Sequence, residues 1–523
     1  MAYNSFLYFG LFLSLTYLVW LAAPARRRPL VLLGASALFY WLSSGRYILW
    51  FILAAVVTWR CGLALRQFDE LVAETGPRLE KADRKALKKR VTALKQGALA
   101  VGCRLLAGML VWLKYTPFLA RSVNTLLVRL PGMAALPVSQ WVLPLGISFY
   151  TLMAVSYLTD VYRGVALPAA RFWQVALYLG FWPHVVEGPF DRFGALGPTL
   201  LSESQKPSYR NLSFGAQRIV WGLFKKVVVA DRANALVKAV FDDYTRYSGA
   251  ATVLGTLLYT LQLYAEFSGC MDIVAGSAEL FGVRIAENFR QPFFSRSAGE
   301  FWRRWHITLG GWLKDYLFQP LIMSRPMAGF GRWCRRTFGP AAGRNLPVWL
   351  GLAASWALIG LWHGAGWIYL VYGLYYAGLM ILGQAAEPLW LRLLPRLPAW
   401  RQTRPYKLFQ MARTFVLVNI GMLLFRSAGV SNAWYMLRHL AVPYRGSLLI
   451  KIDARDFAVL LLGAMLILLA DVLHERGVPV RQAVAQKPLP LRWAVYAGGV
   501  LLVLTLGAYG DHYDPAAFIY AQF

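Results

Sequence analysis

The feature that most constrains this chain is a run of 42 residues, 345–386, that carries no formal charge. A transmembrane helix needs about 20 consecutive apolar residues, so this run is long enough for two such helices in succession. A second uncharged run of 19 residues, Ser5–Ala23, lies near the N-terminus. Hydrophobic residues make up 58% of the sequence and charged residues 15%, whereas soluble domains carry about 25% charged residues. We therefore expect an all-α, polytopic integral membrane protein.

After the first apolar run, eleven more apolar segments, two of them inside residues 345–386, bring the expected total to about eleven to thirteen membrane helices. They are Leu30–Ser43, Tyr47–Leu65, Gly97–Leu119, Trp141–Leu158, Phe172–Val186, Ala250–Tyr264, Leu346–Trp362, Trp367–Ala386, Leu408–Phe425, Phe457–Ala470 and Trp493–Gly510. The amphipathic segment Gly215–Val240 could cross the membrane or lie along its surface. No repeat or soluble domain is visible, so residues 1–523 are predicted to form a single membrane domain.

The positive charge of the chain predicts its orientation. The net charge is +30, and the segment Arg66–Lys95 alone holds nine basic residues against five acidic ones. Cytoplasmic loops of membrane proteins carry an excess of Lys and Arg. Together with Arg26–Arg28 after the first apolar run, this segment predicts a cell (inner, cytoplasmic) membrane protein with its N-terminus outside and residues 66–95 in the cytoplasm. Anionic lipids explain the basic residues better than nucleic acid does. The loop is expected to be a helical hairpin broken at Gly76-Pro77.

One histidine interrupts the long uncharged run. His363 stands in the segment Gly360–Trp367, where Gly364 and Gly366 permit a break between two helices. A neutral imidazole among aromatic residues can act as a general base near pH 7. It could instead be hydrogen-bonded across helices or lie at the membrane surface, and the residues alone favour these alternatives over catalysis.

A second histidine lies in the polar, tryptophan-rich stretch Glu300–Leu317. If the stretch is one helix, Glu300 and Arg304 have the spacing of an ion pair, and Arg303 and His306 share a face. Its tryptophans could line a site or form an interfacial belt; they are Trp302, Trp305 and Trp312. An amphipathic helix on the membrane surface is the alternative.

A third polar stretch, Tyr264–Asp272, contains two carboxylates, Glu266 and Asp272. Paired carboxylates can indicate metal or acid–base chemistry, but basic residues nearby favour salt bridges that fix buried helices. The sequence contains no recognisable metal-binding spacing, and we expect no metal.

In this order the three stretches resemble the membrane-bound O-acyltransferase (MBOAT) family. The likeness is to its bacterial branch, which includes the membrane subunit of alginate O-acetylation and the D-alanyl transfer protein of teichoic acid synthesis. The matching segments run from about residue 140 to the C-terminus, with the core motifs at 140–386. They are Leu143–Tyr150, Asp160–Arg163, Phe181–Pro189, Glu266–Gly269, Asn288–Pro292, Glu300–Leu317, Gly360–Gly364 and Phe518–Phe523. Glu266 stands where the usual motif has aspartate.

The resemblance implies a site in which His363 is the essential histidine and His306 a second one, at the narrow point of a central funnel of helices. It implies no bound cofactor and a thioester donor, either acyl-coenzyme A or an acyl carrier with phosphopantetheine. The residues expected to bind substrate or donor, or to line the funnel, are Trp302, Arg303, Arg304, Trp305, Trp362, Glu266 and Asn288.

The leading hypothesis is an acyltransferase that moves an acyl group, most simply acetyl, to a hydroxyl of a cell-envelope polysaccharide or to a relay protein. D-alanyl transfer to teichoic acid is the alternative within the family. A secondary transporter or flippase is the alternative from another class, because many spans and buried charges also describe transporters. Besides membrane lipid, the expected partner is an extracytoplasmic hydrolase-fold or acyl-accepting protein.

Overall fold

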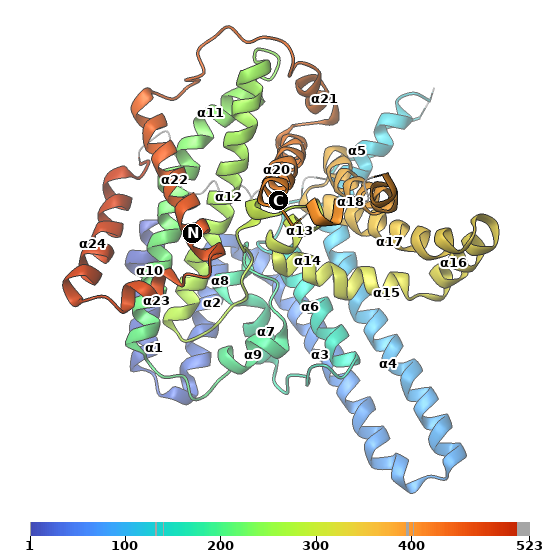
Figure 1. Ribbon diagram of the computed structural model, residues 1–523. Helices are drawn as coiled ribbons and strands as arrows, with labels where there is room; N and C mark the ends of the chain where they lie inside the picture. Colours follow the sequence, from blue (N-terminus) through green and yellow to red (C-terminus); the bar gives the residue numbers. More distant parts are fainter. Residues whose placement is uncertain (1, 131–132, 140, 394–396, 401, 510–523) are drawn as a thin grey trace. The chain divides into compact units, whose positions relative to one another are not determined.

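The computed structural model describes the chain except for residues 1, 131–132, 140, 394–396, 401 and 510–523. The regular elements of the described part are helices, and one isolated antiparallel bridge joins Phe289 to Trp305 (Figure 1). The predicted all-α fold is confirmed. The motif Phe518–Phe523 lies outside the described residues.

By length and apolar composition, seven helical stretches of the described chain can cross a membrane. They are Ala25–Arg78, Lys81–Leu127, Pro340–His363, Trp367–Leu393, Arg404–Arg426, Ala454–Glu475 and Leu489–Leu506. Two of them contain more than one helix: the first holds α2 (Arg28–Ser44) and α3 (Ile48–Thr75), and the second holds α4 (Lys81–Leu110) and α5 (Thr116–Leu127). The protein is therefore a multi-pass membrane protein, and the total of eleven to thirteen spans stays a prediction.

The chain divides into two compact units, of which the first comprises residues 1–216 and 274–286. Its further elements are η1 (Leu7–Leu13), α1 (Ser14–Ala22), α6 (Ile147–Tyr162), α7 (Phe172–Gly180), α8 (Trp182–Val185) and α9 (Phe193–Leu200). The interior of this unit is aromatic. The indole N–H of Trp182 donates to the hydroxyl of Tyr8 at 3.2 Å, which in turn donates to Ser277 Oγ at 2.9 Å.

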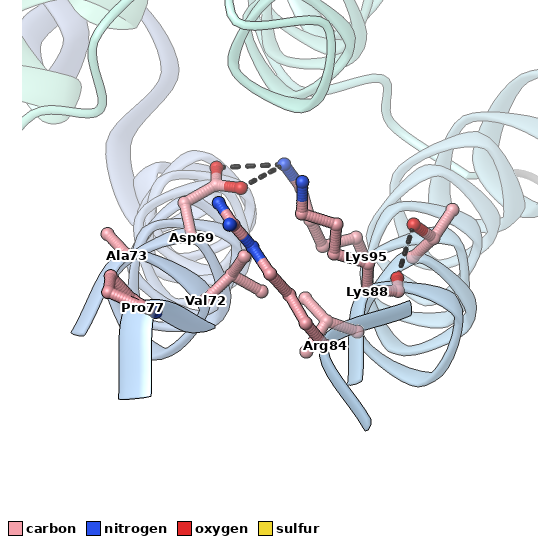
Figure 2. Close-up of a pocket in the computed structure, with 9 residues that line it drawn as sticks. Asp69, Val72, Ala73, Pro77, Arg84, Lys88 and Lys95 are labelled. Carbon is pink, nitrogen blue, oxygen red and sulfur yellow. Dashed lines mark hydrogen bonds and ion pairs between the residues drawn. The ribbon is translucent and has the colours of Figure 1, made fainter. Parts of the chain in front are cut away.

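Within this unit, α3 and α4 form the predicted helical hairpin, which turns at η4 (Gly76–Arg78). A groove between the two helices is lined by both charged and apolar side chains (Figure 2). Lys95 Nζ on α4 donates to the carboxylate of Asp69 on α3 at 2.6 and 2.8 Å, while Arg84 and Lys88 are exposed. These features are those of a water-exposed hairpin that a helix-to-helix ion pair holds together.

The second unit comprises residues 217–273 and 287–523. It contains the end of α10 (Tyr209–Leu223) and most of α12 (Gly249–Leu280). Its other elements are η6 (Phe224–Ala230), α11 (Asp231–Asp242), η7 (Pro292–Phe294), α13 (Ala298–Arg304), α14 (Ile307–Leu313), η8 (Lys314–Phe318), α15 (Gln319–Ile322), α16 (Arg325–Phe338), α17 (Pro340–His363), α18 (Trp367–Leu393), α19 (Leu397–Trp400), α20 (Arg404–Arg426), α21 (Val430–Arg438), α22 (Ala454–Glu475), α23 (Val480–Ala485) and α24 (Leu489–Leu506).

Buried ion pairs fix α12 against η6 in this unit. Lys226 Nζ lies 3.0 Å from Glu266 Oε1 and 2.9 Å from Asp231 Oδ1, and Lys225 pairs with Asp272. Because charges this deep are costly unless they are paired, the network holds the two elements in one register. The salt bridges predicted for Glu266 and Asp272 are confirmed.

Candidate functional site

His363 is the last residue of α17, at the predicted break between two helices. Gly364 is extended, and α18 begins three residues later at Trp367. The two helices meet backbone to backbone. A Cβ on Gly360 would lie 2.0 Å from the carbonyl oxygen of Tyr369, and one on Gly373 would lie 2.1 Å from that of Trp356. This close approach holds the end of α17 against α18, and His363 is only 2% exposed.

His306 lies in a turn rather than in a continuous helix. Helix α13 ends at Arg304, Trp305 is extended, and His306 has the left-handed angles φ 48° and ψ 50°. The prediction that Arg303 and His306 share a helical face is therefore wrong, and Arg303 is exposed. The predicted ion pair between Glu300 and Arg304 is present at 3.0 Å.

Asn288 holds this turn in place through hydrogen bonds. Its carbonyl oxygen accepts from the backbone N–H of Ile307 at 3.0 Å. Its side-chain Oδ1 accepts from both the backbone N–H and the hydroxyl of Thr308, at 3.1 and 2.6 Å. The adjacent bridge between Phe289 and Trp305 continues the same contact. A non-glycine residue with positive φ is uncommon, so these bonds over-determine the conformation of His306. They also explain why the helix breaks.

The two histidines lie in one cluster of aromatic side chains within the second unit. Their ring centroids are 6.5 Å apart, close enough for one small polar group to contact both imidazoles. Phe267 of α12 meets His306 edge to face at 4.8 Å, and Phe425 of α20 meets His363 in the same way at 5.3 Å. Trp362 is near both histidines, 6.1 Å from His306 and 5.0 Å from His363. His306 is 1% exposed, so it is shielded from bulk water.

The other predicted tryptophans support this aromatic cluster. Trp302 is half-buried and packs edge to face on Trp356 at 4.8 Å and on Tyr376 at 5.0 Å. Within the described part of the chain, its buried indole N–H meets no acceptor. Trp305 is buried and stacks on Phe301 at 5.4 Å. Both therefore hold α13 in place, and Trp302 also presents a polar group that a substrate could use.

Comparison with known proteins identifies the chain. Residues 169–331 match the model of the membrane-bound O-acyltransferase family. The chain is 32% identical over 432 residues to the probable alginate O-acetylase AlgI of Azotobacter vinelandii, covering 82% of this chain and 75% of that one. The chain belongs to the MBOAT family. It is thus an acyltransferase.

Two relatives in this family carry other names. The peptidoglycan O-acetyltransferase of Helicobacter pylori is 28% identical over 374 residues, covering 66% of this chain and 65% of that one. The teichoic acid D-alanyltransferase of Bacillus subtilis is 26% identical over 241 residues, covering 45% and 58%. The region that matches the MBOAT model contains Glu266, Asn288 and His306, whereas His363 lies beyond it.

The surroundings of His306 favour its neutral form. Burial away from water disfavours the charged form, and it lowers the pKa of His306 to about 3. At physiological pH, His306 is therefore an uncharged ring that can donate one hydrogen bond and accept another.

Three other predicted site residues make contacts with parts of the second unit other than the histidine rings. Arg304 forms ion pairs with Glu300 at 3.0 Å and with Glu475 at 2.7 Å. Glu266 is 3% exposed and paired with Lys226, and the side chain of Asn288 bonds to Thr308 and to Met271. These three residues hold other parts of the unit, whereas Trp362 contacts both histidines.

Sequence reasoning missed three aromatic residues that contact the histidines. Phe267, Tyr372 and Phe425 come from three different helices, and Tyr372 lies 6.1 Å from His363. Phe267 stands inside the motif Glu266–Gly269, which could have pointed to it. The other two carry no chemical marker in the sequence, because aromatic residues are common throughout the chain.

Proposed function

We propose that this membrane acyltransferase moves an acyl group, in the simplest case acetyl, from a cytoplasmic thioester to a hydroxyl of a cell-envelope polysaccharide or of a relay protein. The observation that supports this proposal is the aromatic cluster in which the rings of His306 and His363 lie 6.5 Å apart. The relatives named for alginate and peptidoglycan O-acetylation support the choice of acyl group and acceptor class.

In the proposed reaction, His363 is the general base. Its imidazole takes the proton of the acceptor hydroxyl as the oxygen attacks the thioester carbonyl carbon. The resulting tetrahedral oxyanion needs hydrogen-bond donors, which the neutral His306 and the indole N–H of Trp302 or Trp362 can supply. Collapse of the intermediate breaks the carbon–sulfur bond. The proton held by His363 then passes to the departing thiolate, so His363 ends the cycle neutral and the ester is the product.

The donor is proposed to be acyl-coenzyme A or a carrier-bound acyl phosphopantetheine, with no cofactor bound to the protein. Phosphate groups of such donors are attracted by basic side chains, and the exposed Arg303 lies three residues before His306. Delivery from the cytoplasm to an envelope polymer also requires the predicted orientation, with the N-terminus outside and residues 66–95 inside. The proposed partner is an extracytoplasmic hydrolase-fold or acyl-accepting protein that receives the group.

Two other functions have less support. D-alanyl transfer is supported by a relative named for that activity, whose alignment covers 45% of this chain. The alignment with the alginate relative covers 82%. A secondary transporter or flippase is not favoured, because the chain belongs to an acyltransferase family.

Reconstitution tests the proposal. Purified protein in liposomes, with labelled acetyl-coenzyme A inside and alginate or peptidoglycan fragments outside, should transfer label only when an extracytoplasmic acceptor protein is added. Transfer to polymer without that protein would remove the relay from the proposal. A carrier loaded with D-alanine serves as the second donor, and transfer from it alone would favour D-alanylation. The variant His363→Ala gives the background rate.

A further inference from the structure

Helix α16 (Arg325–Phe338) has three distinct sides. Met327 and Cys334 are buried and seven residues apart, so they share one face of α16, and α16 packs against α17 (Figure 1). A second side carries Phe330 and Trp333, and a third carries the exposed Arg332, Arg335 and Arg336. Packing against α17 accounts for the buried side of α16. It does not account for the exposed aromatic side or the exposed basic side.

The position of α16 along α17 is fixed by close contacts. A Cβ on Gly331 would lie 3.2 Å from both the carbonyl oxygen of Gly343 and the ring of Pro347, and one on Gly343 would lie 2.5 Å from Arg335 Cβ. The second half of α16 therefore lies beside the first turns of α17. Because α17 is long and apolar enough to cross a membrane, this contact lies at the N-terminal end of a candidate span.

Four exposed arginines lie where α16 turns into α17, with no acidic residue near them in the sequence. We call Arg332, Arg335, Arg336 and Arg344 the arginine cluster; all four are exposed. No Asp or Glu occurs anywhere in residues 316–386, and no ion pair involves the cluster in the part of the chain that the structure describes. A guanidinium matches the geometry of a phosphate group and binds it through two parallel hydrogen bonds.

The aromatic side supplies an anchor of the kind found at membrane surfaces. Trp333 is 54% exposed and Phe338 is 61% exposed. Trp333 stacks on Phe330 at 5.8 Å, and Phe338 meets it edge to face at 5.6 Å. Such a group is costly in water, whereas tryptophan is enriched at the level of lipid headgroups.

We propose that the arginine cluster, where α16 turns into α17, binds the headgroup phosphates of anionic phospholipids. Two observations favour lipid over an acidic protein as the occupant. The cluster lies beside the N-terminal end of a helix that is long and apolar enough to cross a membrane, and exposed aromatic rings flank it on α16. Clustered basic residues attract anionic headgroups, and tryptophan is enriched at the same level of the bilayer.

Lipid retention tests the proposal. The full-length protein is purified from nanodiscs that contain equal amounts of phosphatidylglycerol and phosphatidylcholine, and bound lipids are counted by native mass spectrometry. The wild type should retain phosphatidylglycerol preferentially. The triple variant Arg332→Gln, Arg335→Gln, Arg336→Gln should bind it roughly tenfold or more weakly.

The matched control removes the same charge from the exposed hairpin, as Lys85→Gln, Lys88→Gln, Lys89→Gln, and should retain the lipid like the wild type. Equal retention of both lipids by the wild type, or equal losses in the two triple variants, would overturn the proposal.

A second measurement keeps all the arginines, so it can be made even if the arginine variant unfolds. A spin label is placed at Thr337→Cys, or at Lys85→Cys as control, in a background with Cys61→Ser and Cys103→Ser. In otherwise unchanged protein in liposomes, the label at position 337 should be more accessible to oxygen than to a water-soluble nickel complex, and the label at position 85 the reverse. A label at 337 that is as accessible to nickel as the control would show α16 in water, as expected for a protein-docking surface, and would refute the lipid assignment.

Discussion

The imidazoles of His306 and His363 lie 6.5 Å apart, one in a left-handed turn between two short helices and the other at the C-terminus of a membrane-spanning helix. The two residues are 57 positions apart in the sequence, so their rings meet only because α13, α14, α17 and α18 pack together. In the proposed reaction, His363 is the base, the turn positions His306, and the crossing of α17 and α18 positions His363.

Removing the base should abolish turnover without unfolding the protein. General-base catalysis contributes about 10²–10⁴-fold to a rate, so we expect His363→Ala to lose that factor in acyl transfer while thermal unfolding changes little. His306→Ala should lose less. The control is His439→Ala, because His439 stacks on Tyr435 at 3.9 Å and should not affect transfer. Wild-type turnover by a folded His363→Ala protein would end the assignment of the base.

Asn288 should matter for activity through His306 rather than through substrate. Asn288→Ala removes the side-chain acceptor of the part-buried Thr308 N–H and hydroxyl, at a cost of about 1 kcal/mol for each hydrogen bond lost, and loosens the turn that holds His306. We expect a lower kcat, an unchanged KM for acceptor and a lower melting temperature. Thr308→Val removes only the hydroxyl bond, at 2.6 Å, and should give a smaller loss of the same kind. If Asn288→Ala raises KM and spares stability, then Asn288 contacts substrate.

The sequence predicted the parts of this site that local chemistry determines. Gly364 and Gly366 beside His363 indicate a helix break regardless of the tertiary contacts of that segment, and the structure has this break. The turn at Trp305–His306 was missed because distant residues cause it: Asn288 and Phe289 bond to that segment and override its helical spacing. The contact of Phe425 with His363 likewise depends on how α20 packs, and the residue types around Phe425 do not predict that packing.

The crossing of α17 and α18 should not tolerate a methyl group at its closest point. In Gly360→Ala the new Cβ would lie 2.0 Å from a backbone carbonyl oxygen, so the helices must separate and His363 must move. We expect both transfer activity and the melting temperature to fall. Gly378→Ala on α18 is the control, since a Cβ there meets nothing within 4 Å. In a helix this change stabilises by about 0.5–1 kcal/mol. Equal melting temperatures for the two variants would show that the crossing is not tight.

The orientation of the chain can be measured in intact cells. The basic hairpin should be cytoplasmic, so an impermeant thiol reagent should miss Lys88→Cys and reach Ala2→Cys, both in a background with Cys61→Ser and Cys103→Ser. Permeabilised cells provide the control, because both cysteines should then react. Labelling of Lys88→Cys from outside in sealed cells would reverse the predicted topology, and with it the side from which the donor arrives.

The buried cluster around Lys226 should be structural, and two substitutions can distinguish that role from substrate binding. Lys226→Met leaves the carboxylates of Glu266 and Asp231 buried without their shared partner. Breaking such a pair costs about 3–5 kcal/mol, so the melting temperature should fall steeply. Glu266→Gln leaves Lys226 paired with Asp231 at 2.9 Å and should cost much less. Neither variant should change the KM for acceptor, provided that it folds. A raised KM in Glu266→Gln, at an unchanged melting temperature, would instead place Glu266 in contact with substrate, one of the roles that the family resemblance implies.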